Sequence, residues 1–381
     1  MNVGLSEEQE ALVGTVREFA ERVLAPGAAQ RDADETLPFE LLEQAGELGL
    51  GGIYAREEVG GSGLNRHDGV LIFEELARGD VPVASFISVH NMVVWMIDAY
   101  GSGELRRSWV ERLAPMREYA AYALTEPGAG SDAAALATTA VRDGDDWVLT
   151  GTKQFITGAG VASVYVVMAR TGGPGAKGIS AFIVPADSPG LSFGPREKKM
   201  GWRAQPTRQV ILDGVRVPAG NLLGEEGRGF RMAMAALNGG RLNIAACALG
   251  GAEWAFDRAV RYVQEREAFG APLAAIDTVV FQIADMRVKL AASRALLHDA
   301  ARALDAGVKD APAQCAMAKR FTTDSAFDVA NQALQLHGGY GYLADYGLER
   351  TVRDLRVHQI LEGTNEIMAM IVGRSVLDAA R

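Results

Sequence analysis

The chain has 381 residues, of which 48% are hydrophobic and 23% are charged, and its formal net charge is −10. This length is sufficient for two or three domains with a sizeable core, and the negative charge argues against a nucleic-acid partner bound through its phosphates. Cys247 and Cys315 both lie in helical patterns and the five His residues are scattered, so the sequence indicates neither a disulfide framework nor a metal site.

We predict neither a targeting segment nor a membrane-spanning segment. The chain enters a helical pattern near its start, without a basic or Arg/Ser-rich leader. No apolar run approaches the roughly 20 residues that cross a bilayer. We therefore expect a cytoplasmic bacterial protein with no membrane partner, or a mature chain whose targeting segment is not included.

Helical patterns occupy the first part of the chain. Ser6 and Gln9 form the two ends of a capping box, and an apolar face then continues to Val23 before Pro26, which is expected to end the first helix. Further helices are predicted over residues 39–48, 68–78, 85–100 and 104–113, with a glycine-rich loop at 50–63. Residues 1–118 are therefore predicted to form an N-terminal helical domain.

Short runs rich in β-branched and aromatic residues follow. They cover residues 119–124, 136–142, 147–153, 163–169, 179–184 and 209–217, with Gly, Pro and Asp between them. Since no helix separates consecutive strands, a Rossmann unit is excluded, and Gly128-Ala-Gly130 is not a dinucleotide fingerprint. Residues 119–228 are predicted to form a middle domain built as an antiparallel β-barrel.

Long helical patterns return after Gly229, over residues 230–237, 242–266, 277–304 and 311–336, with a last helix from Thr364. The apolar spacing in these segments suits a four-helix bundle, so residues 229–381 are predicted to form a C-terminal helical domain. The predicted fold is mainly α with a central β domain.

Two strand ends in the middle domain carry hydroxyl groups beside glycines. Tyr122–Asp132 runs from a strand into a glycine turn that contains Thr125 and Ser131, and its backbone N–H groups suit a polar ring or a phosphate. In 153–158, alternation along the strand predicts that Phe155 and Thr157 point to the same side. An ordinary β-bulge with a glycine-rich turn and a core aromatic explain the same patterns when each is taken alone.

The C-terminal domain contains two further candidate segments. Gln335–Gly341 closes a helix with several glycines, as if a thin ligand lay against the backbone. Three arginines, at positions 241, 266 and 374, are candidates for phosphate or thioester contacts, although a surface location explains any one of them.

The stretch 353–367 contains Glu362 between an apolar pair and Gly363, just before Thr364, which is a candidate helix N-cap. Partial burial raises the pKa of a carboxyl group and makes it a better proton acceptor near neutral pH. Taken alone, the stretch is also compatible with an ordinary loop that carries a solvated glutamate.

Taken together and in this order, the segments 122–132, 155–157, 266–270, 335–341 and 361–366 resemble the acyl-CoA dehydrogenases over essentially the full length. Four segments, 197–202, 205–207, 237–241 and 357–363, resemble the subgroup that acts on isobutyryl-CoA in valine breakdown. The resemblance implies a homotetramer with one FAD per subunit, which passes its electrons to an electron-transferring flavoprotein. It also implies that Glu362 removes the α-proton of the acyl-CoA while FAD accepts a hydride from the β-carbon.

The resemblance also assigns binding residues. Those implied at the flavin ring are Tyr122, Leu124, Thr125, Gly130, Ser131, Phe155, Ile156 and Thr157. Those implied at the FAD of a neighbouring subunit are Arg266, Gln335, Gly338 and Gly339. Phe269 is implied as a further FAD contact, and the residues that complete the site are Thr364, Asn365 and Glu366. Those implied along the acyl-CoA are Ser131, Asn238, Arg241, Gly363 and Arg374.

Three positions depart from patterns common in the family, and a fourth, Gly240, bears on the identity of the base. One subgroup has its base where this chain has Gly240, so Glu362 is the sole candidate, and we hypothesise that Gly240 leaves space for an α-methyl branch. Phe155 replaces a frequent Trp, Asp277 a Gln that contacts FAD, and Ala369 a frequent Arg.

Other functions stay open. 2-Methylbutyryl-CoA and butyryl-CoA are alternative substrates, because one methylene contributes only about 1–3 kcal/mol of discrimination. A flavin-bearing DNA-protection protein on the same scaffold would need a basic face, which the net charge of −10 opposes.

Overall fold

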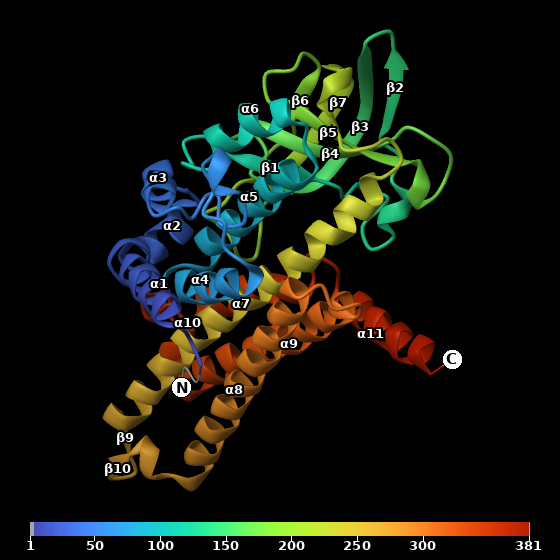
Figure 1. Cartoon of the computed structure of the whole chain (residues 1–381). Helices are drawn as coiled ribbons and strands as arrows, with labels where there is room; N and C mark the ends of the chain where they lie inside the picture. Colours follow the sequence, from blue (N-terminus) through green and yellow to red (C-terminus); the bar gives the residue numbers. More distant parts are fainter. Residues whose placement is uncertain (1–3, 381) are drawn as a thin grey trace.

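The computed structural model describes residues 4–380, so the two terminal residues of the predicted domain ranges, 1 and 381, lie outside the described part of the chain. The N-terminal part is helical (Figure 1). Its α-helices are α1 (Glu7–Phe19), α2 (Ala28–Asp34), α3 (Phe39–Glu47), α4 (Arg66–Gly79), α5 (Val81–Tyr100) and α6 (Gly103–Leu113), with a short 3-10 turn at Glu57–Val59.

The capping box at the start of α1 is confirmed: the Ser6 side chain accepts a hydrogen bond from the Gln9 backbone, and the Gln9 side chain accepts one from the Ser6 backbone. The prediction that Pro26 ends this helical run is wrong. A π-helical turn (Ala20–Leu24) and a 3-10 turn (Ala25–Gly27) lead on into α2. Pro26 is tolerated because it sits in the first turn of the 3-10 segment, where a backbone N–H has no intrahelical partner.

Helix α5 corrects the expectation that no apolar run approaches the length of a membrane span. Val81–Tyr100 has 20 residues and a mean hydropathy of 1.3, which suffices by length and composition. Yet 89% of its apolar window is buried inside the protein, against α4, α7 and the first strand. Its apolar character is therefore accounted for by packing in the protein core.

The middle part is one eight-stranded sheet. Its strands are β1 (Ala120–Ala123), β2 (Thr139–Asp143), β3 (Asp146–Thr157), β4 (Val164–Arg170), β5 (Ile179–Pro185), β6 (Leu191–Phe193), β7 (Thr207–Pro218) and β8 (Leu222–Leu223). Their order is β6-β7-β3-β2-β4-β5-β8, with β1 paired to β4. Most pairs are antiparallel as predicted, but β1 runs parallel to β4, and β2 meets β4 at one parallel pair.

Strand β3 is irregular at its functional end. The register against β7 shifts between Lys153 and Ile156, and Phe155 has a left-handed φ of 58°. Strict alternation therefore does not hold there, so it gives no basis for placing Phe155 and Thr157 on one side. Phe155 is 64% exposed, whereas Ile156 is only 3% exposed.

The C-terminal part begins with α7, a single helix from Gly229 to Glu265, where the sequence predicts two. It runs the length of the molecule from the strands to the small hairpin of β9 (Glu267–Ala268) and β10 (Ala271–Pro272) (Figure 1). The helices that follow are α8 (Asp277–Asp305), α9 (Ala311–Leu336), α10 (Leu348–Arg356), which the sequence patterns do not predict, and α11 (Asn365–Ala379). Helix α9 packs against α7, α8, α10 and α11, and α4 and α5 pack on the other side of α7.

The glycines of α7 explain why it continues unbroken. A Cβ at Gly239 would lie 2.4 Å from the Arg66 guanidinium, and one at Gly250 would lie 2.0 Å from the Glu74 carbonyl oxygen. These glycines therefore permit close packing of α4 on α7, and the packing offsets the roughly 1 kcal/mol by which each glycine weakens a helix.

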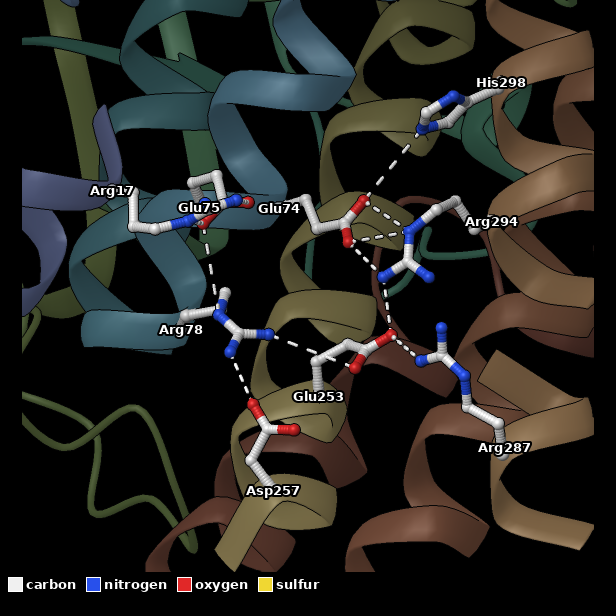
Figure 2. A network of polar contacts seen from close by, with 9 residues as sticks. All are labelled: Arg17, Glu74, Glu75, Arg78, Glu253, Asp257, Arg287, Arg294 and His298. Atoms are coloured by element: carbon white, nitrogen blue, oxygen red, sulfur yellow. Dashed lines mark hydrogen bonds and ion pairs between the residues drawn. The ribbon is translucent and has the colours of Figure 1, made fainter. Parts of the chain in front are cut away.

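A network of charged side chains joins α4, α7 and α8 (Figure 2). Arg294 on α8 donates to Glu74 on α4 and, at 2.5 Å, to Glu253 on α7. Arg287 also contacts Glu253. Glu74 and Glu253 are 7% and 4% exposed, so these buried pairs fix α4 and α8 against α7, the helix that also contains Gly240 and Arg241.

Candidate active site

Glu362 lies in a short loop between a 3-10 turn (Val357–Gln359) and α11; we call residues 360–364 the Glu362 loop. Its φ is 54°, a left-handed conformation that costs a non-glycine residue about 1–3 kcal/mol and persists only when its surroundings enforce it. Gly363 follows with a φ of 93°, and the Thr364 side chain accepts from the Ile367 backbone N–H at 3.3 Å, which starts α11. The predicted N-cap is confirmed.

The Glu362 carboxylate lies against α7 at Gly240. A Cβ built on Gly240 would be 2.4 Å from Oε2 and 3.0 Å from Cδ of Glu362. The hypothesis that Gly240 leaves free space for a branched acyl group is therefore wrong as stated, because the carboxylate of Glu362 fills the space that the missing Cβ leaves.

The carboxylate has an electrostatic setting suited to taking up a proton. Burial raises the pKa of Glu362 to about 7, with the charges of Arg241 and Lys319 acting in the opposite direction. Its Oε2 is buried without a hydrogen-bond partner within the described chain, and the hydroxyl of Tyr122 from β1 is in the same state. Burial, and then the charge of Glu362, raise the pKa of Tyr122. Two unsatisfied polar groups so placed indicate a ligand-binding position.

The Glu362 loop is held from two helices. Arg241 of α7, which is 5% exposed, donates from Nε to the Glu362 carbonyl oxygen at 3.3 Å and from Nη1 to Oδ1 of Asn238 at 2.9 Å. Lys319 of α9 donates to the Gly363 carbonyl oxygen at 2.8 Å and to Oδ1 of Asn365 at 2.9 Å. Four residues predicted from the sequence therefore lie in the hydrogen-bond network at Glu362: Asn238, Arg241, Gly363 and Asn365. Lys319 was not predicted. A lysine within the small-residue run of α9 was the available signal.

The glycine turn after β1 is anchored by a buried ion pair that sequence reasoning also missed. Lys153 is 0% exposed and lies 2.7 Å from Oε1 of Glu126. Glu126 further accepts from the backbone N–H groups of Ala137 at 2.6 Å and Thr138 at 2.9 Å. The backbone N–H of Gln154 donates to the Thr125 carbonyl oxygen at 2.8 Å, so the two predicted strand ends are joined. Gly128 and Gly130 face open space, with no atom within 4 Å of a Cβ built there.

A second group of predicted residues gathers at the far end of α7. Arg266, Gly338 and Gly339 line a hollow of about 350 Å³ together with Tyr262, His337 and Tyr340. Phe269 projects beside it, 100% exposed, and Gln335 is exposed but does not line the hollow. Arg374 is exposed on α11, which extends away from the body of the molecule (Figure 1). Within residues 4–380, no hydrogen bond, ion pair or common hollow joins any of these residues to Glu362.

Sequence comparison with protein families covers almost the whole chain. The acyl-CoA dehydrogenase N-terminal domain matches residues 6–117, the middle domain matches 121–215, and the C-terminal domain matches 227–377. The chain belongs to the acyl-CoA dehydrogenase family. Members are oxidoreductases that act on a CH–CH bond of an acyl-CoA, and they depend on FAD.

Individual relatives match over at least 90% of their own length. Mitochondrial isobutyryl-CoA dehydrogenase from Bos taurus is 50% identical over 376 residues, which is 99% of this chain and 90% of that protein. Acryloyl-CoA reductase (NADH) from Anaerotignum propionicum is 44% identical over 380 residues, 99% of this chain and 96% of that protein. Short-chain specific acyl-CoA dehydrogenase from Bos taurus is 41% identical over 382 residues, 100% of this chain and 92% of that protein.

Solved structures of related proteins have the same fold as this chain. Butyryl-CoA dehydrogenase from Megasphaera elsdenii superposes with a TM-score of 0.95 at 38% identity, covering 99% of this chain and 100% of that one. A chain from a study of the electron transferring flavoprotein of Acidaminococcus fermentans gives 0.96 at 40% identity, with 99% and 100% covered. A glutaryl-CoA dehydrogenase from Mycobacterium smegmatis in complex with FADH2 gives 0.92 at 33% identity, with 98% and 95% covered.

The residues present fit FAD. Around the strand ends, the open glycine turn and the hydroxyls of Thr125, Ser131 and Thr157 offer the neutral donors and acceptors that a polar ring requires. The unsatisfied Tyr122 hydroxyl faces the same region as Glu362. The hollow at Arg266 combines a guanidinium group with bare glycine backbone, which suits a phosphate-bearing segment. Residues 4–380 contain no cluster of three His, Cys, Asp or Glu side chains that could hold a metal ion.

Proposed function

We propose that the protein is an isobutyryl-CoA dehydrogenase that converts isobutyryl-CoA to methacrylyl-CoA in valine breakdown. The observation that carries this proposal is the 50% identity to isobutyryl-CoA dehydrogenase over 99% of the chain, compared with 41% to the short-chain specific enzyme.

In the proposed reaction, Glu362 is the base. A thioester acidifies its α-hydrogen, and a carboxylate with a pKa of about 7 is matched to removing that proton near neutral pH. The backbone N–H of Glu362 is positioned by the fixed loop to donate to the thioester oxygen, which stabilises the charge that develops there. FAD, when bound, would supply the hydride acceptor for the β-carbon. The proton goes to Glu362 and a C=C bond forms.

The remaining chain contacts are proposed as follows. The residues of the 122–131 turn and Phe155–Thr157 would hold the flavin ring. The FAD of a neighbouring subunit would be held by Arg266, Gln335, Gly338 and Gly339. Phe269 would be a further FAD contact, and Thr364, Asn365 and Glu366 would complete the site. The acyl-CoA lies along Ser131, Asn238, Arg241, Gly363 and Arg374. The domain limits are proposed at 1–118, 119–228 and 229–381.

We also propose a homotetramer that passes electrons to an electron-transferring flavoprotein. Large apolar side chains at the bundle end support association between subunits: Phe269 is 100% exposed, Phe281 65% and Val288 66%. Exposed apolar side chains mark an interaction surface where they form a contiguous patch. The Arg266 hollow would fit a cofactor shared between subunits, and the fully exposed Phe269 lies close to Arg266 in the chain.

Anaerobic titration tests the substrate. The yellow protein is mixed with isobutyryl-CoA, 2-methylbutyryl-CoA or butyryl-CoA, and the loss of flavin absorbance is followed. The proposal predicts the highest kcat/KM with isobutyryl-CoA, by about 10-fold or more over butyryl-CoA, since one misplaced methyl group is worth about 1–3 kcal/mol. Faster reduction by butyryl-CoA would refute the isobutyryl assignment and leave the reaction class intact.

A further inference from the structure

Lys319 lies beneath the Glu362 loop with a side chain that is 0% exposed. Its Nζ donates to the Gly363 carbonyl oxygen at 2.8 Å and to Oδ1 of Asn365 at 2.9 Å. Both acceptors are neutral: Gly363 directly follows Glu362 in the chain, and Asn365 is the first residue of α11. A buried ammonium group is costly to desolvate, so its placement on two neutral acceptors, in this loop and at the start of α11, calls for a function there.

Helix α9 also forms side-chain hydrogen bonds to residues on both sides of Glu362. Oδ1 of Asp324 accepts from Nδ2 of Asn365 at 2.7 Å and from Nε2 of Gln359 at 2.7 Å. Asn365 also donates to Oγ1 of Thr323 at 3.0 Å. Helix α9 therefore fixes one residue before the Glu362 loop and one residue after it.

Two buried cations hold two successive carbonyl groups. Arg241 of α7 binds the Glu362 carbonyl oxygen, and Lys319 of α9 binds the Gly363 carbonyl oxygen. Glu362 and Gly363 both have left-handed backbones, with φ values of 54° and 93°. The loop is strained, and it is hydrogen-bonded to Arg241 of α7 and to Lys319 of α9. The direction in which the Glu362 side chain leaves the backbone therefore depends on both hydrogen bonds.

We propose that Lys319 is a positioning residue for Glu362, which fixes the loop through the Gly363 carbonyl and supplies a positive charge that keeps the carboxylate ionised. The inference rests on the proposed role of Glu362 as the base. Lys319 acts through the loop and its own charge.

Few charged groups face Glu362, so the charge of Lys319 contributes substantially to its ionisation. Glu362 faces Arg241 and Cys247 from α7, Lys319 from α9 and Tyr122 from β1, and only the arginine and the lysine are cationic. Both lower the pKa of Glu362, against the burial that raises it.

Lys319 is itself charged at neutral pH. Burial lowers its pKa to about 8, opposed mainly by Glu362. Arg241 lowers this pKa further, while Asp324 and Glu366 raise it. Removing the Lys319 charge therefore leaves Glu362 protonated over a wider pH range.

The test compares Lys319→Met, which removes the charge and the donor, with Lys319→Gln, which keeps an N–H donor without the charge. Lys289→Met is the matched control, because Lys289 is 43% exposed and pairs with Asp328, away from the loop. Each flavin-loaded protein is assayed for the pH dependence of flavin reduction by its best acyl-CoA substrate. Hydrogen exchange of the peptide 357–368 gives a readout independent of turnover.

We expect the acid limb of kcat/KM to move up by about one pH unit in both Lys319 variants, with kcat reduced at least about tenfold in Lys319→Met and KM within about twofold. The loop amides should exchange faster in Lys319→Met than in Lys319→Gln, and Lys289→Met should match wild type in all readouts. A wild-type acid limb with wild-type exchange in Lys319→Met overturns the proposal.

Failure of both Lys319 variants to fold also overturns it, in favour of a purely structural lysine. A Glu362→Gln protein that still reduces its flavin refutes the base assignment instead, so the two failures are distinguishable.

Discussion

The Glu362 carboxylate packs on the bare backbone of Gly240, where a Cβ would lie only 2.4 Å from Oε2. The Glu362 carboxylate, which comes from a loop, thus occupies the space that a side chain at position 240 of α7 would need. The absence of a side chain at position 240 is a condition for the orientation of Glu362, because neither the helix backbone nor the gripped loop can shift freely.

Gly240→Ala should therefore damage catalysis more than stability. The added methyl group displaces the carboxylate, and a misplacement of about 1 Å costs on the order of 100-fold in rate. We expect kcat to fall by that order while flavin absorbance and acyl-CoA binding persist. Gly14→Ala in α1 is the control, since a Cβ there meets nothing within 4 Å. A Gly240→Ala enzyme with wild-type kcat would contradict the packing described here.

The shared space also predicts a relocation of the base. Glu362→Gly should abolish flavin reduction, and adding Gly240→Glu to that variant should restore part of it, because the new carboxylate leaves α7 toward the emptied position. Stopped-flow reduction rates of the single and double variants check this. No recovery in a double variant that still binds flavin would count against the equivalence of the two positions.

Ionised Glu362 should destabilise the folded protein. Its folded pKa of about 7 lies above the ordinary 4.5, so the folded state holds the proton more tightly and loses stability as pH rises from about 4.5 through 7. Glu362→Gln removes this loss and should raise the unfolding free energy at pH 8 by up to about 3 kcal/mol. The two proteins should converge below pH 5 in calorimetry, with Glu10→Gln on exposed α1 as a neutral control. A less stable Glu362→Gln protein at pH 8 would show that burial is not the dominant effect.

Arg294 should be essential to the charged network of Figure 2. It donates to both buried carboxylates, so Arg294→Met leaves Glu74 and Glu253 short of a counter-charge and should cost about 3–5 kcal/mol. Arg287→Met is the matched control: Arg287 is 42% exposed and Glu253 keeps Arg294, so the loss should stay within about 1 kcal/mol. Chemical denaturation of the two variants compares them.

The change in unfolding free energy at low pH provides a second check on the role of Arg294. Burial opposes ionisation of Glu74, but His298 and Arg294 outweigh it and lower its pKa to about 2. The stability from this group is present above pH 4.5 and is lost as pH falls toward 2. In Arg294→Met, the unfolding free energy should decrease less steeply as pH falls over this range. Equal costs for the two arginine variants, or an unchanged acid dependence, would contradict the role given to Arg294.

Much of the fold follows from local patterns in the sequence. The helices 39–48 and 311–336, and the strands 163–169 and 179–184, lie within one residue of where they are predicted, because their periodicity and their end residues agree. The errors come from tertiary packing. Gly239 and Gly240 read as a helix break, yet Arg66 and Glu362 pack on them and α7 continues. The left-handed Phe155 likewise breaks an alternation that the sequence of β3 implies.

The site is predictable only in part, for the same reason. Glu362, Thr364 and Arg241 stand out by residue type and by flanking glycines, and the structure brings them together. Lys319 and the Glu126–Lys153 pair act through partners distant in the chain, so the local sequence does not indicate which groups they contact. Arg266 and Arg374 lie away from Glu362 within one chain, and their proposed roles depend on contacts that a single subunit does not make.

The central claim is that Glu362 removes the α-proton of an acyl-CoA. Anaerobic titration of the yellow Glu362→Gln protein with isobutyryl-CoA, beside wild type, tests it most directly. The account predicts that the variant binds the ligand, seen as a shift in its flavin spectrum, but retains its flavin absorbance, while wild type is bleached. Bleaching of Glu362→Gln at a rate close to that of wild type would contradict it.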